Sequence, residues 1–435
     1  MSRAGFTVNA VAVVVVAAAV IGFALISHRA AAWPVTMPMV FVALGVATAA
    51  SGWVTLDVEA EGLALVGEVT LAVILFGDAV RIDTRVLRRE LGMPARLLGI
   101  GLPLAIVLGT LIVAGLLPGI GLAEAALVAV ILAPTDPALG QAVVTNDAVP
   151  QRVRQGLNVE SGLNDGLVLP AVLVLIAVVA GEDTAAGSWL GLLGRQLGLG
   201  ALIGIGVGFL GGWLIRRGAA AGRVEGIYAQ LGTLSVAVLA LAGADLLGAN
   251  GFIAAFSAGL AFGTMSDREA AHLDEYTEDT GRLLAVVAFF VFGNVFVLPA
   301  VSALSWQVAL CGVLLLTVGR LLPVALSLIG FRAAAPTVLF VGWFGPRGLA
   351  SILFGLLLVQ REVPAAQEFF AVIATTVVAS VFLHGTTAAW GARRYGNWFQ
   401  AHKERHNAMA EAVPVTAQRV RWQRNARHAG TGRPS

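Results

Sequence analysis

The chain has 435 residues, of which 58% are hydrophobic and only 12% are charged, with a formal net charge of +2. Soluble domains carry roughly 25% charged residues, so this chain lacks the polar surface that a water-soluble protein of its length needs. The composition excludes a disordered chain, a coiled coil, a disulfide-rich scaffold and an ordinary cytosolic enzyme. It predicts an all-α, polytopic membrane protein.

Thirteen apolar segments follow one another along the chain. A spanning helix needs about 20 mostly apolar residues, and breaks at charges and turn residues separate the candidates. The first segment is kept as a helix rather than a signal peptide, because one arginine precedes it and it is long enough to span. The predicted spans are 7–27, 35–50, 61–80, 96–117, 121–144, 156–180, 189–216, 226–247, 250–265, 281–300, 305–329, 334–358 and 366–390.

Arginines gather in alternate loops between these spans. Because loops rich in Lys and Arg face the cytoplasm, we expect the N-terminus outside and the C-terminus in the cytoplasm of an inner (plasma) membrane. Residues 1–395 are the predicted transmembrane domain, and residues 396–435 form a short basic cytoplasmic tail. We expect this tail to lie near anionic lipid headgroups, and no nucleic-acid partner is predicted for so short a segment.

Thirteen spans allow an internal symmetry. Spans 1–6 and 8–13 can form two six-helix repeats of opposite orientation, with span 7 as the connector, as in many transporters. The residues themselves show no clear repeat, so this interpretation depends on topology alone.

Polar groups occur at one depth in four of the predicted spans. They are Thr135-Asp136-Pro137 in span 5, Asp165 in span 6, Arg320 in span 11 and Gly345-Pro346-Arg347-Gly348 in span 12. At about 1.5 Å per residue, all four lie roughly 13–17 Å from the cytoplasmic edge of a core about 30 Å thick. Ionisable groups at this depth are costly and usually mark an ion pathway.

Span 6 presents a polar stripe. At about 100° per residue, Glu160, Ser161, Asn164 and Asp165 fall on one face of the helix. A structural polar seam is the alternative, but two carboxylates at membrane depth are costly for packing alone.

Spans 5 and 12 each contain a helix breaker at that depth. Pro137 and Pro346 remove backbone donors, so both helices are predicted either to kink or to unwind where they line a buried cavity. Crossed broken helices would bring opposite half-helix ends together. Asp136 would then balance the positive ends and Arg347 the negative ends.

Arg320 needs an acidic partner inside the membrane. Glu160 is the best candidate, because it faces the same cavity near the same depth. This pairing leaves Asp165 as the other carboxylate of the polar stripe.

Three motifs resemble signatures of a known family, the cation/proton antiporter-1 family of prokaryotic NhaP-type antiporters, related to eukaryotic sodium/proton exchangers. They are Ala-Pro-Thr-Asp-Pro at 133–137, Glu-Ser-Gly-Leu-Asn-Asp-Gly at 160–166 and Gly-Pro-Arg-Gly at 345–348. The position of Arg320 and the stretch from 250 to 260 are also similar. The resemblance covers about residues 7–390.

The resemblance implies a thirteen-helix antiporter fold with a dimerisation domain, a six-helix core domain and a homodimeric assembly. It implies that Asp165 binds the cation and the proton alternately, with Thr135, Ser161 and Glu160 at or next to the ion. Positions matching Asn164 and Arg320 hold Glu160 in that family, and those matching Asp136 and Arg347 balance the charges of the crossed helices.

The predicted activity is exchange of an alkali cation, Na⁺ first with K⁺ or Li⁺ as alternatives, for H⁺ in pH and sodium homeostasis. Carboxylate, hydroxyl and carbonyl oxygens suit such a hard cation, and no cofactor is needed. Because the predicted site has one exchanging carboxylate, electroneutral 1:1 exchange is expected. A sodium-coupled solute symporter, a cation channel and an intramembrane hydrolase are the alternatives. The hydrolase lacks both a G-x-S-x-G and an H-E-x-x-H motif.

Overall fold

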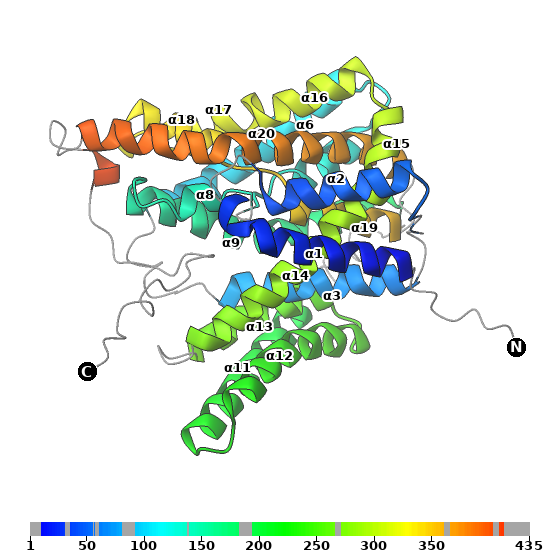
Figure 1. Cartoon of the computed structure of the whole chain (residues 1–435), viewed down its shortest axis with the longest axis vertical. Helices are drawn as coiled ribbons and strands as arrows, with labels where there is room; N and C mark the ends of the chain where they lie inside the picture. The colour runs from blue at the N-terminus through cyan, green and yellow to red at the C-terminus, as the bar shows by residue number, and fades with distance from the viewer. Residues whose placement is uncertain are drawn as a thin grey trace, which may run out of the picture.

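A computed structural model describes residues 10–30, 35–54, 56, 61–80, 92–136, 139–181, 194–265, 271–360, 366–402 and 409–412. Within these ranges the regular elements are all helical, and they form one bundle (Figure 1). Six described helices are long and apolar enough to cross a membrane, and shorter apolar helices accompany them. The chain is therefore an all-helical membrane protein, as its composition predicts.

The first half of the chain supplies the elements before residue 180. A π-helical turn, Leu97–Gly101, joins two of them into one continuous helix. The helices are α1 Ala10–Ala30, α2 Met37–Ala50, α3 Glu61–Val80, α5 Gly92–Arg96, α6 Leu102–Leu116, α7 Leu122–Ile131, α8 Gln141–Val144 and α9 Gln151–Val179.

The second half begins with another π-helical turn, Gly194–Leu199, that leads into a long helix. The helices are α11 Gly200–Ala220, α12 Gly226–Leu246, α13 Gly251–Met265, α14 Ala271–Val295, α15 Val297–Ser302, α16 Trp306–Leu316, α17 Val318–Ser327, α18 Ala335–Trp343, α19 Leu349–Gln360 and α20 Ala366–His402.

Several helices extend beyond the apolar segments that mark them in the sequence, α14 and α20 by the most residues. α14 begins at Ala271 rather than near 281, and α20 continues from the expected end near 390 to His402. Hydropathy marks the part of a helix that faces apolar surroundings, whereas the helix itself can continue into polar residues. Residue 396, the expected start of the tail, therefore falls inside α20. Most of the tail, 403–408 and 413–435, lies outside the described residues.

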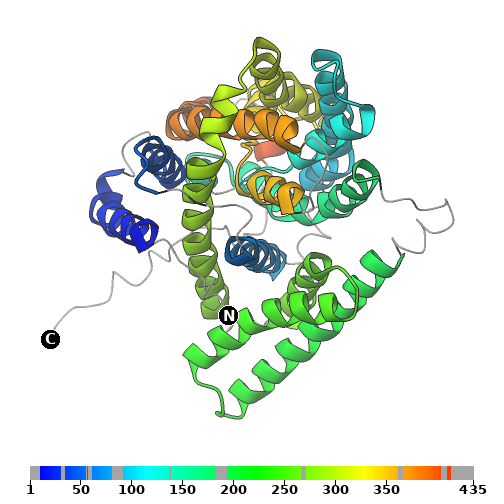
Figure 2. The ribbon, with the colours of Figure 1, turned by 90° about the vertical axis from the view of Figure 1, so that its right-hand side faces the viewer.

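Close helix packing explains part of the high glycine content. α11 and α13 lie side by side in the group of helices at the bottom of Figure 1, which Figure 2 shows from another side. A Cβ on Gly204 or Gly208 would overlap the backbone of Ala254 or Ala258 in α13. Small residues at helix contacts let backbones approach in this way inside membranes.

A short segment after α20 folds back onto the bundle. Glu411, in the 3-10 turn Ala410–Ala412, is buried and accepts hydrogen bonds from the Thr337 hydroxyl at 2.6 Å and the Ala334 amide at 3.2 Å. Arg152 at the start of α9 donates to the Ala410 carbonyl at 2.8 Å. Since Ala334 precedes α18, the carboxylate of Glu411 caps the N-terminus of that helix.

Candidate functional site

Two interrupted helices meet in the middle of the bundle. α7 ends at Ile131, and α18 and α19 are separated by the non-helical residues 344–348. The two interruptions touch, because the Asp136 amide donates to the Pro346 carbonyl over 2.7 Å. Pro346 is buried at this crossing, whereas Pro137 lies outside the described residues. Backbone that leaves its helix is tolerated at membrane depth only where it is buried in protein or lines a cavity.

Charged side chains satisfy the helix ends at the crossing. Asp136 Oδ2 accepts a hydrogen bond of 2.8 Å from the amide of Leu349, the first residue of α19. The Arg347 guanidinium donates to the carbonyls of Ala133 and Pro134, just beyond the C-terminus of α7. A carboxylate at a helix N-terminus and a cation at a C-terminus both oppose the partial charges of the helix ends. The geometry thus has the compensation expected from the sequence.

Polar side chains of α9 face the interruption after α7. The Thr135 and Ser161 hydroxyl oxygens lie 2.8 Å apart, and the Asn164 amide donates to Thr135 Oγ1 over 2.8 Å. Asp165 is also buried, one turn of α9 beyond Ser161. The side-chain carbonyl of Asn164 accepts no hydrogen bond from any described residue. The cluster therefore gathers a carboxylate, two hydroxyls and an amide oxygen at one buried place.

Glu160 and Arg320 form a buried ion pair beside this cluster. Arg320 Nη1 and Nη2 lie 2.5 and 2.8 Å from the two carboxylate oxygens of Glu160, with side chains 3% and 2% exposed. Arg320 lies near the start of α17, where the helix resumes after a break at Thr317. A Cβ on Gly345 would overlap the Arg320 guanidinium, so the pair packs against the crossing itself.

Asn164 differs from the role that the family resemblance implies. Its amide donates to Thr135, whereas both oxygens of Glu160 accept from Arg320. The physical reason is that the interruption after α7 brings the Thr135 hydroxyl against the Asn164 face of α9. Asn164 therefore supports the site through Thr135 in this structure.

Sequence reasoning missed two serines at the crossing. Ser351 Oγ donates to the Ile131 carbonyl at 2.7 Å, and Ser380 Oγ accepts from the Arg347 amide at 2.6 Å. Both are fully buried. Serines are frequent in membrane helices, and the only available signal was that Ser351 follows the Pro-Arg-Gly break by a few residues.

Comparison with known proteins identifies the family. Residues 13–394 match the family model described as sodium/hydrogen exchanger, transmembrane. The chain belongs to this family. It is 28% identical over 274 residues to the K(+)/H(+) antiporter NhaP2 of Shewanella oneidensis, covering 61% of this chain and 46% of the relative. It is 25% identical over 357 residues to the K(+)/H(+) antiporter NhaP of Alkalimonas amylolytica, covering 81% and 60%.

The chain spans about half the length of these relatives. Its fold resembles that of the sodium proton antiporter MjNhaP1 from Methanocaldococcus jannaschii at pH 8, with a TM-score of 0.73 and 21% identity. The match covers 88% of this chain and 98% of that one. The arrangement of helices is therefore the NhaP antiporter fold.

Proposed function

We propose that this protein exchanges a monovalent alkali cation, Na⁺ or K⁺, for H⁺ across a membrane by alternating access. The observation that carries the proposal is the burial of Asp165 beside the hydrogen-bonded Thr135, Ser161 and Asn164, at the crossing of two interrupted helices. Membership of the exchanger family and relatives named as K⁺/H⁺ antiporters support it. The same findings favour a transporter over an enzyme.

In this proposal Asp165 binds the cation and the proton in turn. Ser161 and Thr135 supply hydroxyl oxygens, and the side-chain oxygen of Asn164 is a further ligand that the geometry adds. Hard oxygen ligands suit a small alkali cation. Glu160 stands next to the ion, and the guanidinium of Arg320 holds its carboxylate in place.

A sodium-coupled solute symporter is the alternative from the sequence, and nothing here supports it. The family is one of exchangers, and the named relatives are antiporters. A symporter would require an organic solute, whereas an antiporter moves protons when only cation is added.

The experiment uses purified protein in liposomes that contain a pH-sensitive dye. Addition of Na⁺, K⁺ or Li⁺ should dissipate an imposed proton gradient for the wild type and leave it intact for Asp165→Asn, because an amide cannot exchange a proton. Asp147→Asn is the matched control, since that side chain is 92% exposed and forms its ion pair with Arg154. Wild-type rates from Asp165→Asn would refute the assignment, and so would loss of transport in both variants.

We also propose electroneutral 1:1 exchange, because one carboxylate holds either one cation or one proton. The test is reconstitution with a membrane potential set by a gradient of a permeant anion, thiocyanate, so that no gradient of H⁺, Na⁺ or K⁺ is imposed. A potential that drives proton uptake sensitive to Asp165→Asn would show that a second charge moves in the cycle.

The membrane topology and the assembly of the protein are part of the same proposal. We infer thirteen spans in two inverted six-helix repeats, a dimerisation domain beside a six-helix core, and a homodimer in the inner membrane. The inferred orientation has the N-terminus outside and the basic tail in the cytoplasm. Three arginines close together at one end of the bundle support this orientation. The Arg96 side chain donates to the carbonyl of residue 329, and the Arg152 side chain donates to the carbonyl of residue 410. The backbone carbonyl of Arg332 accepts from the amide of residue 410. Cysteine labelling from each side of oriented vesicles and cross-linking in membranes would test these points.

A further inference from the structure

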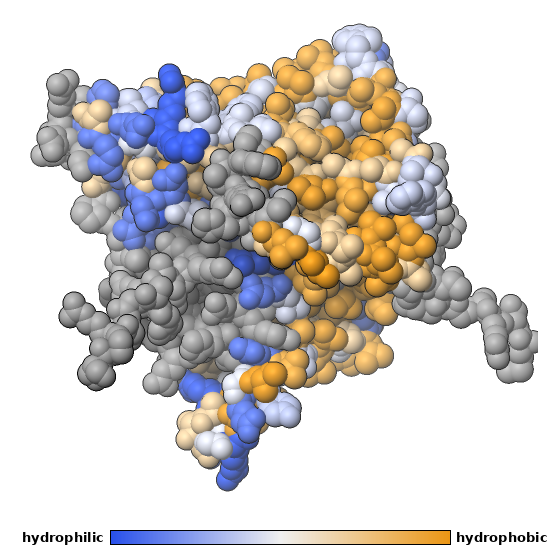
Figure 3. All heavy atoms as spheres, viewed as in Figure 1, coloured by the Kyte–Doolittle hydropathy of each residue, from blue (hydrophilic) through white to orange (hydrophobic). Residues whose placement is uncertain are grey.

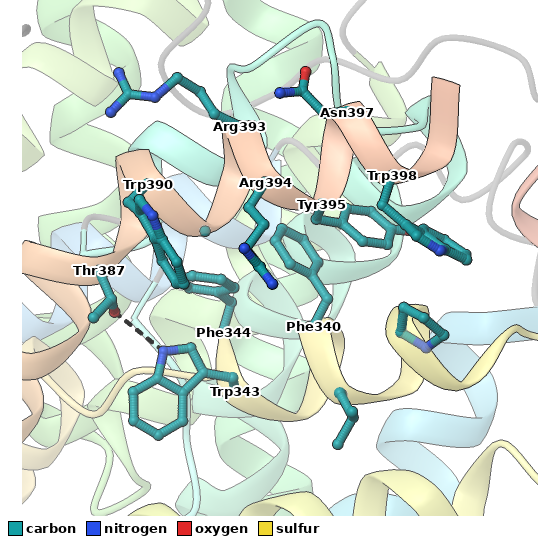
Figure 4. A pocket seen from close by; sticks show the side chains of 13 residues that line it. Phe340, Trp343, Phe344, Thr387, Trp390, Arg393, Arg394, Tyr395, Asn397 and Trp398 are labelled. Atoms are coloured by element: carbon teal, nitrogen blue, oxygen red, sulfur yellow. Dashed lines mark hydrogen bonds between the residues drawn. The ribbon is translucent and has the colours of Figure 1, made fainter. Parts of the chain in front are cut away.

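A groove runs between α18 and α20 on the outside of the bundle, away from the crossing. It has a volume of about 1100 Å³, and its exposed walls are almost entirely apolar. Leu339 and Trp343 of α18 line one side, and Trp390 and Trp398 of α20 line the other (Figure 4). The stacked rings of Phe340 and Tyr395, whose centroids are 4.1 Å apart, lie between the two helices.

One cation enters this apolar groove. Arg394 points between the aromatic side chains in Figure 4, and its guanidinium carbon lies 5.5 Å from the centre of the Trp390 ring. Arg394 is exposed and makes no hydrogen bond or ion pair with any residue that the structure describes. Arg393, its neighbour, also lines the groove, and in Figure 4 its side chain extends in the opposite direction from that of Arg394. The groove therefore combines an apolar channel with the guanidinium of Arg394, which lies among the aromatic rings.

The groove lies where α20 passes from apolar to polar sequence. From Phe369 to Arg393 the helix spans about 36 Å at about 1.5 Å per residue, slightly more than the hydrocarbon core of a bilayer. Figure 3 shows hydrophilic residues gathered at the α8 end of the molecule and hydrophobic residues over much of the rest of that face. Tryptophans concentrate at this kind of membrane boundary, and the groove holds three of them.

We propose that this groove binds one anionic phospholipid from the adjacent leaflet. An acyl chain lies along Leu339, Trp343 and Trp390, and the phosphate binds the guanidinium of Arg394. Arginine suits this role because its planar fork matches phosphate oxygens in two parallel hydrogen bonds. The charge of Arg394 selects an anionic headgroup over a zwitterionic one, whose own cation opposes the arginine.

The position of the groove connects a bound lipid to the candidate site through α18. It bridges α20 and α18, and the chain beyond α18 carries Gly345 against Arg320. A lipid that fixes α18 against α20 therefore stabilises the crossing. The proposal needs the membrane location alone, so it stands or falls separately from the exchange activity.

The test compares Arg394 with an arginine that lies over a tryptophan ring outside the groove. Purified protein is mixed with phosphatidylglycerol, with phosphatidylcholine or with inorganic phosphate, and bound lipid is counted by native mass spectrometry while the melting temperature is recorded. We expect phosphatidylglycerol to bind the wild type and raise its melting temperature, and the other two additions to have little effect. Arg394→Gln should bind phosphatidylglycerol about tenfold less tightly, the change expected from losing one charge-assisted contact. The matched control is Arg217→Gln, an exposed arginine that lies over the Trp213 ring at 5.3 Å and outside the groove. This variant should bind phosphatidylglycerol like the wild type.

A second variant keeps the proposal testable if Arg394→Gln is poorly folded. Leu339→Trp fills the apolar part of the groove while leaving both arginines, and it should also reduce phosphatidylglycerol binding. Equal losses in the two arginine variants would mean that net charge alone attracts lipid. Equal binding of phosphatidylcholine, or equal stabilisation by inorganic phosphate, would also overturn the proposal.

Discussion

Removal of either partner from the Glu160–Arg320 ion pair should destabilise the protein at least as much as removal of both. The two side chains are 2% and 3% exposed, and two hydrogen bonds of 2.5 and 2.8 Å join them. At a charge separation of about 4 Å and an effective dielectric constant of about 20, the attraction is about 4 kcal/mol. Because the charge left behind is buried, Glu160→Gln and Arg320→Gln should each lower the free energy of unfolding by about 3–5 kcal/mol.

The double variant removes both charges together. Its free energy of unfolding should fall no further than that of either single variant. This result corresponds to a coupling free energy of about 3–5 kcal/mol. The free energy of unfolding is measured by titrating SDS into mixed micelles and following tryptophan fluorescence. The surface pair Arg154–Asp147, with a distance of 2.9 Å and side chains 13% and 92% exposed, is the control. Its coupling should stay at or below about 1 kcal/mol. Additive losses for Glu160 and Arg320 would refute the reasoning.

Three further substitutions test the packing around the site. Gly345→Ala should reduce both thermal stability and cation-dependent proton movement, because its Cβ overlaps the Arg320 guanidinium; unchanged stability would contradict the close contact. Ser351→Ala should lower the free energy of unfolding by about 1 kcal/mol through the loss of a buried hydrogen bond, measured as for the ion pair. Glu411→Gln should lower the melting temperature by weakening the cap on α18, while transport by the folded fraction stays at the wild-type rate.

The helices were predictable because lipid imposes a simple demand on sequence. A segment that faces hydrocarbon must be apolar along its whole length, so the apolar segments coincide with helices α1 to α20 within a few residues for most elements. The same demand says nothing about where a helix continues into polar residues, and the ends of α14 and α20 were misplaced for that reason.

The ion pair beside the candidate site was predictable from depth and cost. Arg320 and Glu160 meet because a guanidinium in a membrane helix needs an acid, and few acids were available at that depth. The partner of Asn164 was not predictable, because it depends on the path of the chain after Ile131. That path depends on tertiary contacts, such as the bond from Ser351 to the Ile131 carbonyl, which no local pattern encodes.

The arrangement of charges at the crossing bears on how an exchange cycle could proceed. Asp136 and Arg347 each compensate an end of the other's interrupted helix. Glu160 and Arg320 compensate one another as an ion pair. If Asp165 is the exchanging group, one carboxylate sets the variable charge of the site. Either a cation or a proton then brings the site to the same net charge, and the loaded forms face the same electrostatic barrier to movement. The unloaded form carries an additional buried negative charge, which is costly in a low-dielectric region. Under the proposed function, this difference favours movement of the loaded forms over the unloaded form.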